Sequence, residues 1–174
     1  MPQCKRRGLV DLSPAGVYVA PNVPPVSELV PVSGPVTAVE LRVRYAETDQ
    51  MGVAYHGNYF AWFEVGRTEF LRETGFDYKS LEREEGCYIV VAEASCRYKG
   101  PARYDDLLRI RTELKALRGP VLRFAYSVVR DADGTLLAEG ETAHLVADRE
   151  MKVRTLPEKY LRALEGTMGT GVRK

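Results

Sequence analysis

One aspartate stands between an alternating segment and an aromatic-rich one, and it is the residue type best placed for chemistry. The stretch around it reads Tyr45-Ala-Glu-Thr-Asp-Gln-Met-Gly-Val-Ala-Tyr-His-Gly-Asn-Tyr59. A positioned carboxylate such as Asp49 can activate water as a general base or attack a carbonyl directly. Aspartate is also common in turns and at helix starts because its side chain bonds to nearby backbone groups. The residues alone therefore leave a catalytic and a local structural role open for Asp49.

The elements on either side of this stretch predict where the carboxylate lies. Residues 37–45 alternate, which predicts a strand whose apolar face carries Val39, Leu41, Val43 and Tyr45. Residues 57–74 are apolar over most of a helical circumference and are followed by Gly75, which predicts a buried helix. The loop 46–56 then brings the carboxylate to the helix N-terminus, where free N–H groups and the dipole favour negative charge. That arrangement suits a reaction in which an oxyanion develops on a carbonyl group.

The remainder of the chain predicts a sheet that packs against this helix. A short second helix is expected at 78–85, and a C-terminal helix starts at Thr155 and ends near Leu164. Alternating or apolar runs predict strands at 87–99, 107–117, 122–128 and 136–147, with a hairpin turn at 131–134. An α+β fold in which one antiparallel sheet wraps around one long central helix buries the apolar side of each element. Its edge strand and open face would be covered by homo-oligomerisation.

Composition excludes several classes of protein. The chain has 25 Lys and Arg residues against 24 Asp and Glu, so it lacks the basic excess that nucleic-acid binding by bulk charge requires. No apolar run is long enough to cross a membrane, so membrane insertion is not expected. The three cysteines, Cys4, Cys87 and Cys96, form no CxxC pair, which indicates reduced thiols in a cytoplasmic protein.

The two ends of the chain differ from its middle. Residues 1–36 contain seven of the ten prolines, which disfavours both helix and sheet, so this segment is predicted to be an extended or disordered arm. Asp11 and Pro14 interrupt what would be the apolar part of a signal peptide. The predicted domain spans residues 37–166, and residues 167–174 are expected to form a flexible tail.

Three motifs resemble one known family. The pattern Tyr45-x-Glu-Thr-Asp49-x-x-Gly52-x-x-Tyr55-His56-x-x-Tyr59 resembles the signature of hotdog-fold acyl-CoA thioesterases of the 4-hydroxybenzoyl-CoA thioesterase type, and is closest to the bacterial Tol–Pal-associated group. Phe63-Glu-x-x-Arg67 and Tyr98-x-x-Pro-Ala-x-Tyr-Asp-Asp106 are also similar to that group. The likeness covers about residues 37–160. Glu47 departs from it where the family often has Asp, and Ala54 where a β-branched residue is common.

The resemblance implies hydrolysis of acyl-CoA thioesters to free acid and coenzyme A, without cofactor or metal, at a site between subunits. It implies that Asp49 is the catalytic acid and that backbone N–H groups near Tyr55 and His56 form an oxyanion hole. The His56 imidazole would position water or substrate; the alternative is a histidine that caps or packs at the helix start. A dimer is expected at least, and the favoured assembly is a tetramer of dimers paired back to back.

Several further residues have two interpretations each. Tyr59, Trp62 and Phe63 could line an acyl pocket, although an aromatic stripe at helical spacing is more often core. Arg97 and Lys99, with Arg103, could hold the phosphates of coenzyme A or form a solvated strand face. Glu64 is an alternative catalytic carboxylate, since some hotdog thioesterases use a helix acid, but a pair with Arg67 is favoured.

The remaining candidates are predicted to be structural. His144 is expected to be a satisfied core residue. Cys87 and Cys96 lack a partner base for nucleophilic chemistry, and no ligand-spaced motif predicts a metal site. Two other functions remain open at this point: an acyl-carrier-protein thioesterase of the same fold, and a non-catalytic acyl-binding or scaffold protein.

Overall fold

The computed structural model describes residues 36–165. The predicted arm, apart from its last residue, and the predicted tail at 167–174 therefore lie outside the described residues. None of the helices within the described range is long and apolar enough to cross a membrane.

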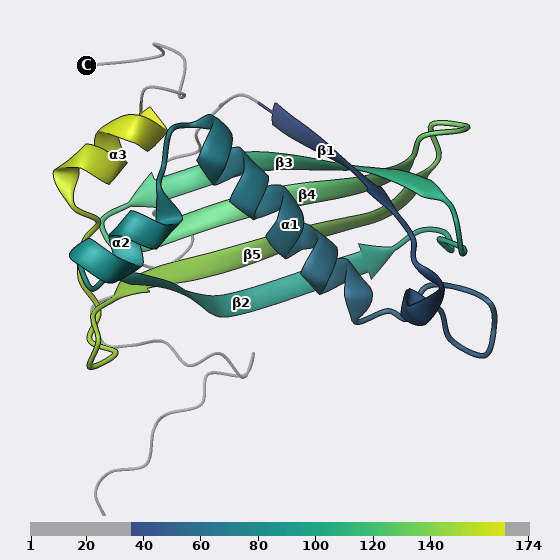
Figure 1. The fold of residues 1–174 in the computed structure, drawn as a ribbon, viewed down its shortest axis with the longest axis horizontal. Coiled ribbons are helices and arrows are strands. Elements are labelled where there is room, and N and C mark those ends of the chain that lie inside the picture. Colours follow the sequence, from purple (N-terminus) through teal and green to yellow (C-terminus); the bar gives the residue numbers. More distant parts are fainter. Residues whose placement is uncertain (1–35, 166–174) are drawn as a thin grey trace, which may run out of the picture.

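Five antiparallel strands form one sheet in the order β1-β3-β4-β5-β2 (Figure 1). The strands are β1 (Val36–Arg42), β2 (Tyr88–Tyr98), β3 (Leu107–Arg118), β4 (Val121–Arg130) and β5 (Leu136–Ala147). The three inner strands lie where alternation predicted them, because every second side chain in them is buried on the face that packs against α1. The sheet edges are β1 and β2.

The central helix α1 (Asn58–Glu73) lies across one face of this sheet (Figure 1). Its sheet-facing side chains are almost fully buried, among them Trp62, Phe63, Phe70 and Leu71. The ring of Phe63 stacks on Tyr126 of β4, with 4.5 Å between ring centroids and 13° between planes. One sheet with one long helix on its face confirms the predicted α+β fold class.

Two glycines allow α1 to approach the sheet closely. A Cβ on Gly140 of β5 would lie 2.4 Å from Cε2 of Phe63, and a Cβ on Gly66 of α1 would lie 2.4 Å from Oγ1 of Thr112. Non-bonded heavy atoms do not approach this closely, so a larger residue at either position would require its neighbours to shift.

Two short helices, α2 (Tyr78–Glu84) and α3 (Glu158–Glu165), lie at the far end of the molecule from the start of α1 (Figure 1). Asp77 caps α2, since its Oδ1 accepts the N–H of Ser80 at 3.1 Å. The C-terminal helix begins at Glu158 rather than at the predicted Thr155.

The first strand is shorter at its C-terminal end than its alternation predicts. β1 ends at Arg42, and residues Tyr45–Glu47 form a 3-10 turn, η2. Tyr45, predicted to share the buried face, is 77% exposed. The alternation is broken because the Glu47 side chain accepts the backbone N–H of Arg44 at 2.8 Å, which curls the chain away from the sheet.

Candidate active site

The loop after β1, the start of α1 and the C-terminal end of β2 come together at one end of the molecule (Figure 1). A groove of about 310 Å³ is lined by residues of these segments. Its polar and titratable lining consists of Asp49, His56, Tyr59, Tyr98 and Lys99. Met51, Val53, Ala54 and Pro101 give it an apolar side. The structure thus brings the predicted acid and the predicted helix start to one concave site.

Asp49 is held in a turn that leaves half of its carboxylate free. Its Oδ1 accepts the N–H of Met51 at 2.8 Å, and its own N–H donates to the carbonyl of Val53 at 2.9 Å. Gly52 closes the turn with φ of +72°, a conformation that favours glycine. No residue within 36–165 donates a hydrogen bond to Oδ2. The turn role is therefore confirmed, and one carboxylate oxygen remains available for chemistry.

The start of α1 offers two backbone donors. The N–H groups of residues 58–60 donate to carbonyls three residues earlier, at 2.9–3.4 Å. The N–H groups of His56 and Gly57 have no acceptor in the described part of the chain. Unpaired N–H groups at a helix N-terminus carry partial positive charge and bind anions or polarised oxygens.

Glu47 ties the loop to the helix. Its side chain is buried, and Oε1 accepts both Nη2 of Arg44 at 2.7 Å and the indole N–H of Trp62 at 3.2 Å. Its backbone carbonyl accepts the N–H of Tyr55 at 2.8 Å and Nδ2 of Asn58 at 2.7 Å. Burial alone would raise the pKa of Glu47, but these hydrogen bonds and the Arg44 charge outweigh it and lower the pKa below its ordinary value.

The segment before β3 supports the same loop from the other side. The N–H of Ala54 donates to the carbonyl of Ala102 at 2.8 Å, and the N–H of Ala102 donates to the hydroxyl of Tyr59 at 3.4 Å. Nη1 of Arg103 donates to the carbonyl of Gly52 at 3.5 Å. Arg103, a candidate phosphate ligand, therefore has a structural contact to the Asp49 turn.

The aromatic residues at the helix start have distinct positions. Tyr55 is exposed, does not line the groove, and its ring lies 4.3 Å from that of His56. Tyr59 is buried in the groove wall, and this burial raises its pKa. The hydroxyl of Tyr98 donates to the carbonyl of His56 at 3.0 Å.

Two of the predicted acyl-pocket residues belong to the core instead. Trp62 and Phe63 are 1% and 0% exposed and are absent from the groove lining, so the structure places them in the core, the interpretation that the helical spacing favoured. The reason is their position on the sheet-facing side of α1, where Trp62 bonds to Glu47 and Phe63 fills the space above Gly140.

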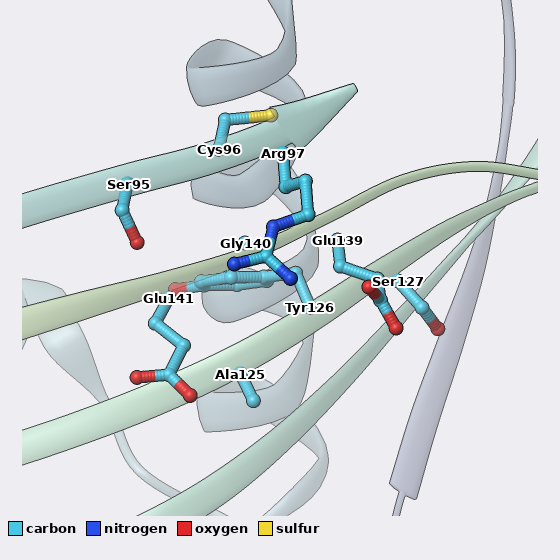
Figure 2. A pocket seen from close by; sticks show the side chains of 9 residues that line it. All are labelled: Ser95, Cys96, Arg97, Ala125, Tyr126, Ser127, Glu139, Gly140 and Glu141. Carbon is cyan, nitrogen blue, oxygen red and sulfur yellow. The ribbon is translucent and has the colours of Figure 1, made fainter. Parts of the chain in front are cut away.

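Arg97 and Lys99, the two predicted phosphate ligands at the end of β2, lie in different places. Lys99 lines the groove, and its Nζ lies 3.1 Å from Oε2 of Glu139. Arg97 lies in a different hollow, on the face of the sheet away from α1, near Glu139 and Ser127 (Figure 2). Grouping Arg97 with the groove is therefore a correction, because strand alternation puts its side chain on the opposite face from Tyr98.

The predicted Glu64–Arg67 pair is not formed. Glu64 is exposed, whereas Arg67 is buried and its Nη1 lies 3.4 Å from Nε2 of His144. His144 also bonds to Oγ1 of Thr142 at 2.8 Å. Burial, with the nearby Arg67 charge, lowers the pKa of His144 to about 3, so the imidazole is neutral. His144 lies in the core as predicted, but it is not fully satisfied, because its buried Nδ1 has no hydrogen-bond partner among the described residues. Within residues 36–165 no cluster of three or more His, Cys, Asp or Glu could hold a metal ion.

Comparison with known proteins decides the family. A family model described as "Thioesterase-like superfamily" matches residues 43–164. "Acyl-CoA thioester hydrolase YbgC" of Escherichia coli O157:H7 is 41% identical over 122 residues, which are 70% of this chain and 90% of that protein. The chain belongs to the thioesterase-like superfamily. The predicted family is thereby confirmed.

Solved structures agree with this assignment to the thioesterase-like superfamily. The DHNA-CoA thioesterase from Staphylococcus aureus superposes with a TM-score of 0.72 at 28% identity, covering 75% of this chain and 89% of that one. A hypothetical protein, TT1821 from Thermus thermophilus, superposes with a TM-score of 0.69 at 38% identity, covering 75% and 98%. The hotdog fold predicted from the sequence is confirmed.

Sequence reasoning gave no role to two residues that organise this thioesterase-like site. Glu47 was visible as an acid two residues before Asp49, but nothing in the sequence shows that it is buried. Tyr98 lies 42 positions from His56, and no local pattern links them. The signal for Tyr98 was its place at the start of the motif Tyr98-x-x-Pro-Ala-x-Tyr-Asp-Asp106, which gives it no partner.

Proposed function

We propose that this chain hydrolyses acyl-CoA thioesters to the free carboxylic acid and coenzyme A, with Asp49 as the catalytic carboxylate. One observation carries the proposal: Asp49 and the start of α1 border the same groove, with an unbonded carboxylate oxygen and two unbonded N–H groups among the described residues. The family, and the activity in the name of the E. coli relative, support it.

The chemistry follows from the charges that a thioester develops. Attack on the carbonyl carbon places negative charge on its oxygen, which the N–H groups of His56 and Gly57 and the α1 dipole stabilise. Asp49 can act in one of two ways. As a general base it takes a proton from the water that attacks the thioester carbonyl carbon; as a nucleophile its own carboxylate attacks that carbon and forms a mixed anhydride, which water then opens. Coenzyme A leaves as the thiolate and is protonated. The His56 imidazole orients water or substrate, Lys99 interacts with the phosphates, and the proposal includes no metal or cofactor.

The test is thiol release from benzoyl-type and short- to long-chain acyl-CoAs. Asp49→Asn keeps the turn, because the amide oxygen can still accept the Met51 N–H, but it removes the base or nucleophile. We expect turnover to fall by about 10²- to 10⁴-fold with an unchanged melting temperature. The matched control is Asp148→Asn, since Oδ1 of Asp148 accepts an N–H two residues on, at 3.0 Å, in the loop after β5. Wild-type turnover in Asp49→Asn would refute the assignment.

Labelled water can reveal a nucleophilic role of Asp49. In a single turnover in H₂¹⁸O, a general base delivers ¹⁸O to the product acid and leaves Asp49 unlabelled. If Asp49 is the nucleophile and water opens the anhydride at the aspartyl carbonyl, the product acid is unlabelled and ¹⁸O remains in Asp49. Opening at the acyl carbonyl gives the same labels as a general base, so ¹⁸O in Asp49, measured by mass spectrometry of the protein, is the result that identifies the nucleophile.

The alternative functions give different results in the same assay. An acyl-carrier-protein thioesterase would prefer carrier-bound substrate to acyl-CoA. Among the described residues, Lys99 is the one lysine or arginine that lines the groove. A non-catalytic acyl-binding or scaffold protein would bind acyl-CoA without releasing thiol.

We further propose a homo-oligomer, a dimer or a tetramer, located in the cytoplasm. No strand of the described chain covers the outer side of β2, where Val91 is 57% exposed, and a second copy pairing along this edge would cover it. Because Tyr98 and Lys99 stand at the end of β2, that pairing would bring the second copy beside the groove. Back-to-back packing of the opposite sheet faces would give the tetramer. Light scattering after size-exclusion chromatography measures the assembly.

A further inference from the structure

Tyr98 is the one side chain from the sheet that bonds to the start of α1 within the groove. Its hydroxyl donates to the carbonyl of His56 at 3.0 Å, and its ring lies edge-on to those of Tyr59, at 5.0 Å, and His56, at 6.5 Å. Burial, with the Cys96 thiol beside it on the same strand, raises the pKa of Tyr98 to about 12. Although the Tyr98 side chain is 44% exposed overall, its hydroxyl stays protonated at neutral pH and can donate the hydrogen bond.

The bonded carbonyl belongs to the peptide group that joins His56 to Gly57. The described chain contains no cis peptide bond, so this group is planar and trans, with its C=O and N–H pointing in opposite directions. Holding the His56 carbonyl therefore also fixes the direction of the Gly57 N–H. The other contact to that carbonyl, from the N–H of Tyr59, is long at 3.4 Å, so the Tyr98 hydroxyl is the shorter of its two hydrogen bonds.

We propose that Tyr98 is a positioning residue, which holds the His56–Gly57 peptide so that the Gly57 N–H faces the thioester oxygen in the transition state. This inference rests on the proposed function for its catalytic consequence, and the hydrogen bond from which it is argued, Tyr98 to the His56 carbonyl, is present without substrate. Pre-oriented donors stabilise an oxyanion because they need no reorganisation when charge develops. Tyr98 links that orientation to β2, so the sheet edge and the helix start are connected by one hydrogen bond.

The test replaces the hydroxyl and keeps the ring. Tyr98→Phe retains the edge-on aromatic contacts, so the melting temperature is expected to stay near that of the wild type. Removal of one oxyanion donor lowers kcat by about 10²- to 10³-fold in other enzymes; here the donor remains but is less well oriented, so we expect a loss in kcat of about tenfold. KM for the acyl-CoA is expected to change little, because ground-state contacts are preserved.

The matched control is Tyr78→Phe. The Tyr78 hydroxyl also donates to a backbone carbonyl, that of Ile89, at 3.4 Å, but it lies on α2, away from the groove. This control is expected to keep wild-type kcat and KM. An unchanged kcat in Tyr98→Phe, or a change confined to KM, would overturn the positioning role and leave Tyr98 as part of the groove wall.

A second measurement does not depend on activity. In the substrate-free protein, the carbonyl ¹³C resonance of His56 and the amide ¹⁵N resonance of Gly57 are expected to move in Tyr98→Phe and to stay in place in Tyr78→Phe. Unmoved resonances in Tyr98→Phe would contradict the inference even if kcat fell. Absence of thiol release from the wild-type protein would instead refute the proposed function, and the resonances would still report whether Tyr98 orients the peptide.

Discussion

Glu47→Gln tests whether the buried acid before the Asp49 turn stabilises the fold. The Glu47 side chain is 8% exposed and receives three hydrogen bonds, from the Arg44 N–H, the Arg44 guanidinium and the Trp62 indole. The Arg44 side chain is 77% exposed, so its ion pair contributes little in water. The two N–H donors, one backbone and one indole, therefore account for most of the effect.

The magnitude follows from those two donors. Glutamine keeps one acceptor oxygen, but its NH₂ group replaces the other oxygen and faces an N–H donor. A hydrogen bond to a charged group contributes about 1.5–3 kcal/mol, and an unsatisfied buried donor adds a penalty. We expect Glu47→Gln to lower the free energy of unfolding by about 2–3 kcal/mol at pH 7, which corresponds to about 5–10 °C in melting temperature for a domain of this size.

The stabilisation by Glu47 is expected to depend on pH in one direction. The pKa of Glu47 is lower in the folded protein than its ordinary value of 4.5, so the unfolded chain binds the proton more tightly. The stabilisation is therefore fully present above pH 4.5 and is lost as the pH falls through the folded pKa. The difference between wild type and Glu47→Gln should narrow on acidification below pH 4.5.

Urea unfolding at several pH values measures this difference. The control is Glu40→Gln on β1, whose side chain is 60% exposed and lies 3.7 Å from the Arg109 guanidinium, and which is expected to change stability by less than about 0.5 kcal/mol. Equal stability of Glu47→Gln and wild type at pH 7, or a difference that does not shrink in acid, would refute the argument.

Two further predictions concern the interior. Because the pKa of His144 is about 3 in the folded protein and near 6.5 when unfolded, stability should fall as the pH drops below 6.5, by up to about 1.4 kcal/mol per pH unit. His144→Gln should flatten this slope between pH 4.5 and 6.5, whatever its stability at pH 7; a slope equal to that of wild type would show another group to be responsible. Gly140→Ala should destabilise by about 1–3 kcal/mol because its Cβ meets the Phe63 ring. Combining it with Phe63→Leu should recover part of that loss in thermal unfolding, and strictly additive losses would contradict the steric explanation.

The elements of the fold could be read from the sequence because each is a repeated pattern. Alternation placed all five strands, and the aromatic run placed α1 to within one residue at each end. The same patterns could not show which aromatic residues face the groove. Tyr59 and Trp62 point in different directions from the same helix. Which of these directions faces the groove depends on how α1 packs against the sheet.

The site could be predicted only where its residues are neighbours in sequence. Asp49 and His56 lie seven positions apart, so loop length alone brings them together. Glu47 gains its donors from Arg44 and from a helix that begins later, and Tyr98 reaches His56 only once β2 has joined the sheet. Arg97 lies outside the groove because it alternates with Tyr98 along β2, and the sequence did not show that the Tyr98 face is the one toward α1.

The close packing of α1 on the sheet determines where an acyl chain can go. Trp62 and Phe63 do not line the groove but fill the core: the Trp62 ring lies 4.6 Å from that of Tyr59, and the Phe63 ring occupies the space that Gly140 leaves open. Under the proposed function, an acyl tail beside Tyr59 would find no space in this core. The packed core therefore limits how far an acyl chain could extend into the protein. Longer tails must turn outward along the protein surface, so tolerance for chain length would be decided by what borders the groove mouth, including any neighbouring subunit, and not by the volume of the core.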